Sequence, residues 1–261
     1  SPVQPMPMQR LDEVLIGRGD VGDEIDAFIA VTEGRVFVNG QKAISPSQEI
    51  GEEDRIEVKP VREFVGRGAE KLNAALAAFG IDAAGKTCAD VGAATGGFTE
   101  VLLKRGAKRV YAIDAGRGKL DPELRADPRV TVLEGTNVLS MKPLPERMDI
   151  ITVDVSLISL RRVLPIVRGW LAEAGSAAPA GGRASPTEGG RVVALFKPQY
   201  EVIDKRLLRH GVLEDEAARG RTLEKFRSWL AANNWREIGM MESPIRGSEG
   251  NAEYLFYLKP S

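Results

Sequence analysis

Cysteine and histidine are almost absent from this sequence of 261 residues, which has Cys88 and His210 as its only examples. A single cysteine excludes a disulfide within the chain, and so few thiol and imidazole groups exclude the usual zinc sites. The longest apolar run covers the eight residues from Ala74 to Ile81, whereas a membrane helix needs about 20. Residues 1–9 lack the cationic start and apolar centre of a signal peptide. We therefore expect a cytoplasmic protein without a metal ion or a membrane association.

The composition is otherwise that of a globular protein. Hydrophobic residues make up 43% and charged residues 28% of the chain, close to the average for soluble domains. The length suits one or two domains. The net charge of −1 does not by itself indicate nucleic acid, membrane or any other partner.

A change of pattern near residue 62 divides the sequence into two parts. Apolar residues at helical spacing predict two short helices in the first part: Leu11, Val14 and Leu15 in one, and Ile25, Phe28 and Ile29 in the other. The run from Arg35 to Gly40 predicts a strand that ends in an Asn-Gly hairpin turn, and Arg55–Val58 a closing strand. We expect disorder at 1–9, a small α+β domain at 10–60 and a linker at 61–70.

The second part, 71–261, alternates strands with helices, which predicts an α/β fold with a parallel sheet between helices. The predicted strands are Thr87–Val91, Arg109–Asp114, Val130–Leu133, Asp149–Asp154, Arg191–Phe196 and Glu253–Leu258. The predicted helices are Leu72–Phe79, Phe98–Arg105 and Leu160–Leu171. Residues 173–190 are rich in Ala, Gly, Ser and Pro and are predicted to form a flexible insertion.

The sharpest motif runs from Asp90 to Thr99 and reads DVGAATGGFT, at the point where the first strand ends and a helix begins. Its glycines let the backbone approach a ligand closely and expose amide groups at the start of the helix. Asp114, twenty-four residues after Asp90, ends the next strand, where an acid can accept hydrogen bonds from a ribose diol. The combination favours a nucleotide-like ligand over a purely structural turn. The glycine order does not match the G-x-G-x-x-G pattern of NAD enzymes, and no P-loop lysine follows.

The motif instead resembles that of S-adenosylmethionine enzymes, and further segments identify the family. These segments are Gly66–Leu72, Val153–Leu160, Leu195–Tyr200, Ser243–Ile245 and Gly250–Tyr254. With them, nearly the whole chain resembles the TlyA (hemolysin A) family, in which an S4-like RNA-binding domain precedes an FtsJ-type ribosomal RNA 2′-O-methyltransferase domain. The resemblance implies a Rossmann-like methyltransferase sheet, S-adenosylmethionine as cofactor, and ribosomal RNA or ribosomal subunits as partner.

The resemblance also implies site residues. The Lys-Asp-Lys-Glu catalytic set of FtsJ-type enzymes falls on Lys71, Asp154, Lys197 and Glu253. Cofactor contacts are expected from Asp90, Gly92, Ala93, Thr95, Gly96, Gly97, Phe98, Asp114, Asn137 and Asp154. RNA contacts are expected from Arg10, Arg18, Arg35, Lys42 and Arg67.

Two catalytic candidates are also supported by their position in the sequence. Asp154 and Lys197 each follow a strand that is otherwise apolar, so both charges should stand at the ligand-binding edge of the sheet. A ribose hydroxyl must lose its proton as it attacks a methyl group. We assign Lys197 as the base and Lys71 as a positioning and polarising group, with Asp154 and Glu253 orienting the two lysines.

The first domain departs from the expectation for an RNA-binding unit. From Arg10 to Lys59 there are six basic and twelve acidic residues, a net charge of −6, and the rest of the chain carries +5. Phosphate contacts dominate RNA affinity, so an acidic RNA-binding domain is unexpected. A methyltransferase for another RNA or a small molecule therefore stays open as an alternative. So does a membrane-lytic protein, although no cationic amphipathic helix supports it. The methylated nucleotide, the ribosomal subunit and the oligomeric state are not indicated.

Overall fold

The computed structural model describes residues 8–32, 34–59, 64–175 and 188–261, and the chain divides into two units after residue 63. Of the segments predicted to be disordered, linking or flexible, residues 1–7, 61–63 and 176–187 lie outside the described residues. Gln9, predicted to be disordered, instead pairs with Ile50, and helix α3 (Gly68–Phe79) begins inside the predicted linker. Among the described residues, no helix combines the length and apolar character needed to cross a membrane.

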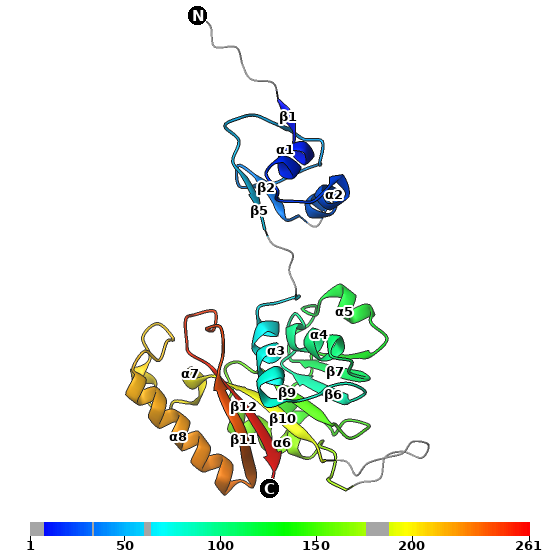
Figure 1. Ribbon diagram of the computed structural model, residues 1–261. Helices are drawn as coiled ribbons and strands as arrows, with labels where there is room; N and C mark the ends of the chain where they lie inside the picture. Colours follow the sequence, from blue (N-terminus) through cyan, green and yellow to red (C-terminus); the bar gives the residue numbers. More distant parts are fainter. Residues whose placement is uncertain (1–7, 33, 60–63, 176–187) are drawn as a thin grey trace, which may run out of the picture. The chain divides into compact units, whose positions relative to one another are not determined.

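The small unit packs two helices against short strands (Figure 1). Its helices are α1 (Leu11–Gly17) and α2 (Glu24–Thr32), and strand β1 (Gln9–Arg10) pairs with β4 (Glu49–Ile50). Strand β2 (Val36–Val38) lies between β3 (Gln41–Lys42) and β5 (Ile56–Val58). The predicted Asn-Gly turn is confirmed, because Asn39 and Gly40 have φ of 52° and 80°, as the tight hairpin turn between β2 and β3 requires.

Helix α2 buries small residues and exposes its large apolar side chains, whereas an amphipathic helix usually buries the large ones. Its buried residues are Ala27, Ala30 and Val31, which pack on Leu11 and Leu15 of α1. The larger residues that predicted the helix, Ile25, Phe28 and Ile29, are 68%, 59% and 41% exposed. The pattern predicted the helix correctly, but its large apolar side chains face away from the core.

The large unit is built on a seven-stranded sheet in the order β11-β12-β10-β9-β6-β7-β8. Five strands are parallel: β6 (Thr87–Val91), β7 (Arg109–Asp114), β8 (Val130–Glu134), β9 (Ile150–Val153) and β10 (Arg191–Phe196). The last two, β11 (Trp235–Glu242) and β12 (Tyr254–Pro260), pair antiparallel, and β12 also pairs antiparallel with β10. The predicted α/β fold with a mostly parallel sheet is confirmed.

Side chains of the strands alternate between two cores, one on each face of the sheet. On one face, Cys88, Val110 and Ile150 pack under α3 and α4 (Gly97–Lys104). On the other, the next residue of each strand packs with α6 (Leu160–Arg168) and α8 (Glu216–Ala232). Short elements complete the unit: α5 (Pro122–Ala126), α7 (Pro198–Glu201), and the 3-10 turns η1 (Val138–Ser140) and η2 (Lys205–Leu207).

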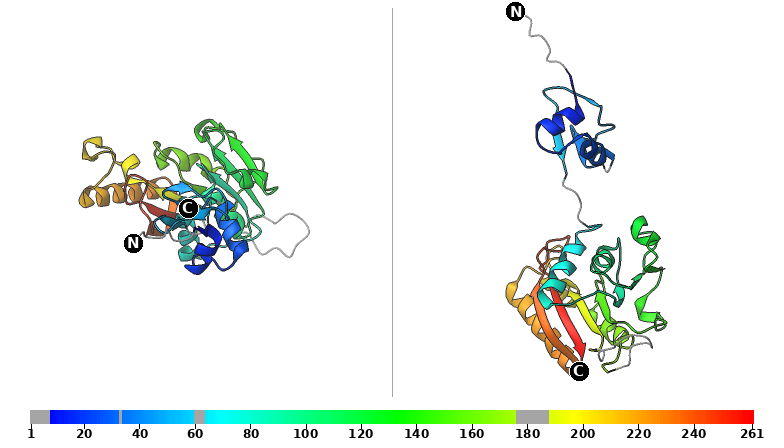
Figure 2. Two further views of the ribbon diagram at one scale, coloured as in Figure 1. Left: turned by 90° about the horizontal axis from the view of Figure 1, so that it is seen from above. Right: turned by 45° about the vertical axis from the view of Figure 1, so that its right-hand side comes forward.

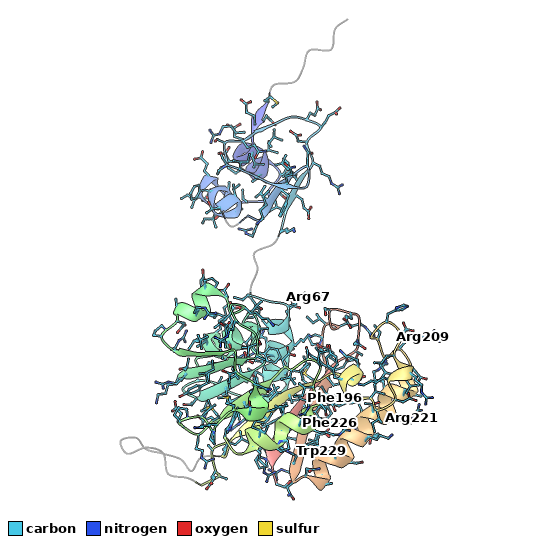
Figure 3. All side chains as sticks on the ribbon, turned by 180° about the vertical axis from the view of Figure 1, so that it is seen from behind. Arg67, Phe196, Arg209, Arg221, Phe226 and Trp229 are labelled. Atoms are coloured by element: carbon cyan, nitrogen blue, oxygen red, sulfur yellow. The ribbon has the colours of Figure 1, made fainter. Side chains whose placement is uncertain are left out.

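The C-terminal part is where the sequence indicated least. No bounds were predicted for helix α8 or strand β11, and Figure 2 shows α8 running alongside β11. Phe226 of α8 is fully buried in an aromatic cluster, with ring centroids 4.7 Å from Phe196, 5.2 Å from Phe256 and 6.1 Å from Trp229 (Figure 3). Because only a few buried residues face the sheet, α8 has a weak helical pattern, and its aromatic contacts fix it in place.

Asp90 of β6 is a carboxylate inside the first core. It has no exposed surface, and its two oxygens accept hydrogen bonds from Thr99 Oγ1 of α4 at 2.7 Å and Thr152 Oγ1 of β9 at 3.0 Å. Burial raises the pKa of Asp90 to about 7. The hydrogen bonds from the two hydroxyl groups act in the opposite direction and lower this pKa. The side chain thus joins two strands and a helix directly beneath the glycine-rich turn.

Replacing Phe226 by alanine should destabilise the protein by about 3–5 kcal/mol, because it removes a fully buried ring from the aromatic cluster. The free energy of unfolding measured in urea tests this expectation. The matched control is Ile203→Ala, since Ile203 is 78% exposed, and that change should stay within about 0.5 kcal/mol. Equal losses in the two variants would contradict the packing described for α8.

The buried Asp90 carboxyl should make stability depend on pH. In the folded protein Asp90 holds its proton up to a pKa of about 7, whereas in the unfolded chain it releases it near 4. Between these values the folded state binds more protons, so stability must fall as the pH rises, by up to about 4 kcal/mol in total. Urea unfolding from pH 4 to 8 should show this fall relative to Asp90→Asn. Parallel profiles for the two proteins would rule out an Asp90 that titrates near neutrality.

Candidate active site

The candidate site lies at the carboxyl edge of the parallel strands, where the strand order changes direction. From β6 the chain proceeds to β7 and β8 on one side, and then returns to β9 on the other side. Loops that leave neighbouring strands in opposite directions open a crevice, and open α/β sheets bind ligands there. A cavity of about 400 Å³ occupies this position, lined by residues that follow β6, β7, β8 and β9. Four predicted cofactor-binding residues line it: Gly92, Asp114, Asn137 and Asp154.

Residue 92 must be glycine because the main chains of the loops after β6 and β9 approach each other closely there. Its φ is +86°, in the left-handed region that glycine adopts readily. A Cβ at this position would stand 2.0 Å from the carbonyl oxygen of Asp154. The two loops that follow β6 and β9 therefore touch through main-chain atoms, which places Asp154 beside the glycine-rich turn.

Asp114, at the end of β7, ties that turn to the next loop. Its Oδ2 accepts a hydrogen bond from the Ala94 amide at 2.9 Å, and its Oδ1 accepts one from the Gly116 amide at 2.7 Å. Asn137 performs a similar task after β8, since its Oδ1 accepts a hydrogen bond from the Leu139 amide and caps η1. Both side chains are thus held at the cavity wall by backbone donors.

The other predicted cofactor residues do not line this cavity. Asp90 is enclosed by its threonine partners, and Phe98 is 3% exposed within the first core. A Cβ on Gly97 would lie 2.9 Å from the Ala69 amide nitrogen of α3, and one on Gly96 would lie 2.3 Å from Leu124. These glycines allow close packing of α4 beneath the turn. Ala93 and Thr95 are also absent from the cavity lining, so contacts from these six residues remain predictions.

The four predicted catalytic residues form two lysine–carboxylate pairs. Lys71 Nζ of α3 lies 2.6 Å from Glu253 Oε2, with 8% and 2% of the two residues exposed. Lys197 Nζ lies 2.6 Å from Asp154 Oδ1 and donates a hydrogen bond to Ser156 Oγ at 3.0 Å. Each ammonium therefore has a carboxylate partner, and Ser156 is an additional polar group that the sequence did not assign a role.

The sheet register explains why residues so far apart in sequence converge. Phe196 pairs with Tyr254 across β10 and β12, so Lys197 and Glu253 occupy adjoining positions at the same edge. Asp154 follows β9, which lies beside β10. Helix α3 packs against β12 and supplies Lys71.

Thr99 and Thr152, the hydroxyl partners of Asp90, were also missed by sequence reasoning. For Thr152 a signal was available, because it is the one polar residue of the apolar strand β9, whereas Thr99 lies in a helix that also carries Glu100 and Lys104. A buried carboxylate needs such donors.

The predicted RNA-binding residues are distributed over both units. In the small unit, Arg10 pairs with Asp12 at 2.6 Å and Arg18 with Asp20 at 2.9 Å. Lys42 is exposed and Arg35 is half-buried, with Arg35 donating to the Lys59 carbonyl. Arg67 is exposed at the N-terminus of α3 in the large unit (Figure 3). Two of these cations, Arg10 and Arg18, are therefore already paired with acids of the small unit.

Comparison with known proteins supports the arrangement. The model of the FtsJ-like methyltransferase family matches residues 64–260. A Mycobacterium tuberculosis (strain ATCC 25618 / H37Rv) protein, described as 16S/23S rRNA (cytidine-2′-O)-methyltransferase TlyA, is 37% identical over 96% of this chain and 89% of its own length. A Brachyspira hyodysenteriae protein named Hemolysin A is 35% identical over 94% of this chain and 98% of its own.

Solved structures agree with this result. A Streptococcus thermophilus structure, named as a candidate hemolysin, is 31% identical with a TM-score of 0.69, and the match covers 98% of this chain and 90% of that one. Because the family model covers most of the chain and the relatives match it along nearly its whole length, this chain belongs to the FtsJ-like methyltransferase family.

Proposed function

We propose that this protein transfers a methyl group from S-adenosylmethionine to a ribose 2′-hydroxyl of ribosomal RNA. The observation that carries the proposal is the pair of lysine–carboxylate contacts at the carboxyl edge of the sheet, one of which includes Asp154 of the cavity wall. Two lysine amino groups and two carboxylates next to a nucleotide-sized cavity suit a reaction that must position a hydroxyl group and accept its proton.

The cavity residues fit the cofactor. Asp114 is the acid that would accept hydrogen bonds from its ribose, and Asn137 would face the adenine edge. Gly92 and Asp154 line the same cavity, and the amino-acid portion would lie beside them. S-adenosylmethionine supplies a methyl group on a positively charged sulfur, which receives the electron pair of the broken S–C bond.

The catalytic residues would act on the RNA hydroxyl. Lys197, after its ammonium group has released a proton to solvent, would accept the 2′-hydroxyl proton on Nζ while the hydroxyl oxygen forms its bond to the methyl carbon. Asp154 and Ser156 hold Lys197 through an ion pair and a hydrogen bond and would fix the direction of its lone pair. Lys71, oriented by Glu253, would position the ribose from the other side. A positioned base of this kind contributes about 10²–10⁴-fold to a rate.

The names of the relatives support ribosomal RNA as substrate. The Mycobacterium relative is named for cytidine 2′-O-methylation of 16S and 23S rRNA, and a Campylobacter jejuni relative, 33% identical over 74% of this chain, for the same reaction on 23S rRNA. The small unit, with Arg10, Arg18, Arg35 and Lys42, together with Arg67 of the large unit, would contribute phosphate contacts as an S4-like domain does. Because the small unit is acidic, we expect both units to share the RNA affinity.

Cofactor binding should depend on the absence of a side chain at residue 92. A Gly92→Ala Cβ would collide with the Asp154 carbonyl, so we expect affinity for S-adenosylmethionine, measured by calorimetry, to fall at least tenfold. Gly118→Ala is the matched control, because Gly118 also has a positive φ, +68°, but open space around its Cβ position. Asp114→Ala should reproduce the loss without the collision. Unchanged affinity in the Gly92 and Asp114 variants would refute the cofactor site.

Lys197→Ala should abolish methyl transfer and leave cofactor binding nearly unchanged, because Lys197 follows β10 and does not line the cavity. The measurement is single-turnover transfer of labelled methyl to purified ribosomal subunits, paired with cofactor titration, and followed by mapping of 2′-O-methyl marks. Lys108→Ala serves as the control, since Lys108 is an exposed lysine at the opposite edge of the sheet. A near-native rate for Lys197→Ala would show that the hydroxyl loses its proton elsewhere.

A further inference from the structure

The exposed face of α2 is a surface that the proposed methyl transfer does not explain. Ile25, Phe28 and Ile29 follow the i, i+3, i+4 spacing, so their side chains share one side of the helix. They are 68%, 59% and 41% exposed, while the small residues Ala27 and Ala30 are fully buried. A helix placed only for its own stability would bury the large residues, because burial of apolar area is the main gain of folding. We call this surface the α2 face.

Acidic groups border the α2 face. The first turn of α2 carries Glu24 and Asp26, and helix α2 contains no basic residue. Asp23 precedes the helix and accepts a hydrogen bond from the Asp26 amide at 2.9 Å. The neighbouring cation Arg10 already contacts Asp12. The whole segment from Arg10 to Lys59 has a net charge of −6, so the acids beside the α2 face favour a cationic partner there.

We propose that the α2 face binds a cationic protein segment that inserts aliphatic or aromatic side chains between Ile25, Phe28 and Ile29. Exposed apolar residues rimmed by charge are typical of protein-binding surfaces. Complementary charge would select and orient the partner. Basic proteins bound to ribosomal RNA have this chemistry, and the choice of the ribosome as their source is the one step that rests on the proposed function.

Charge argues against the two other occupants. RNA bases could stack on Phe28, but their phosphates would come close to Glu24 and Asp26. A second copy of the chain, related by a two-fold axis, would bring two identical acidic rims together, because such an interface uses the same surface twice. A cationic polypeptide satisfies both the apolar side chains and the acids.

The test compares binding to ribosomal subunits with binding to protein-free ribosomal RNA. Small and large subunits, and the RNA extracted from each, are titrated with the full-length protein and with Ile25→Ser/Phe28→Ser. We expect the double variant to bind one of the intact subunits at least tenfold more weakly and to bind the extracted RNA as the parent does. Ile44→Ser is the matched control, because Ile44 is 89% exposed in the loop between β3 and β4; it should change neither affinity.

A second variant tests the charges independently. Glu24→Gln/Asp26→Asn should also weaken binding to the intact subunit, with a smaller difference at high salt, since salt screens exposed charges. The same variant should bind extracted RNA as well as the parent protein or better, because two repulsive charges are gone. Circular dichroism confirms that each variant is folded.

Several results would overturn the proposal. Equal losses on subunits and on extracted RNA would identify the α2 face as an RNA contact. Unchanged binding to both would show that it is not an interface with the ribosome. A parent protein that dimerises in sedimentation while the Ile25→Ser/Phe28→Ser variant stays monomeric would assign the face to a second copy. Failure of the proposed function is recognised separately, by the absence of methyl transfer from the parent protein.

Discussion

The site depends on the contact between the main chains that follow β6 and β9. Gly92 and Asp154 approach so closely that no side chain fits between them, and this contact lies at the carboxyl edge of the two central strands. The charged residues of the site lie around this contact. Asp114 fixes the turn from one side through the Ala94 amide, Lys197 meets Asp154 from the other, and Asp90 supports the turn from below. The cavity is therefore shaped by backbone geometry, and side chains determine its chemistry.

The two lysine–carboxylate pairs differ in the burial of their carboxylates. Lys71 and Glu253 are almost completely enclosed. Removing two charges from water costs several kcal/mol per ion before their attraction is counted, so such a pair is weak evidence for stabilisation. By side-chain exposure the two lysines are alike, at 10% for Lys71 and 12% for Lys197, whereas the carboxylates differ, at 3% for Glu253 and 23% for Asp154. Asp154 is also the member of the two pairs that lines the cavity.

The sequence predicted the parallel sheet, the glycine-rich turn and the positions of the charged residues at the strand ends, because these features depend on local periodicity and on strand termini. It could not predict which lysine meets which carboxylate. The Lys71–Glu253 contact joins residues 182 positions apart, and it follows from the order of strands and from the helix that packs on β12. Nor could the sequence predict the partners of Asp90, whose two oxygens accept hydrogen bonds from Thr99 and Thr152. Local spacing likewise identified α2 as a helix but could not show which side of it is buried. The helix buries Ala27 and Ala30 and exposes Ile25 and Phe28, and this choice depends on tertiary packing.

The position of β12 has a consequence for the way the protein is made. Although β12 is the last strand in the sequence, it lies inside the sheet between β10 and β11. Strand β11 has no other partner in the described sheet, so it cannot dock until β12 has been synthesised. Glu253, immediately before β12, completes the set of charges at the same step. A nascent chain can thus form the loops after β6 and β7 early, while the edge of the sheet that carries Glu253 is assembled only after β12 has been synthesised.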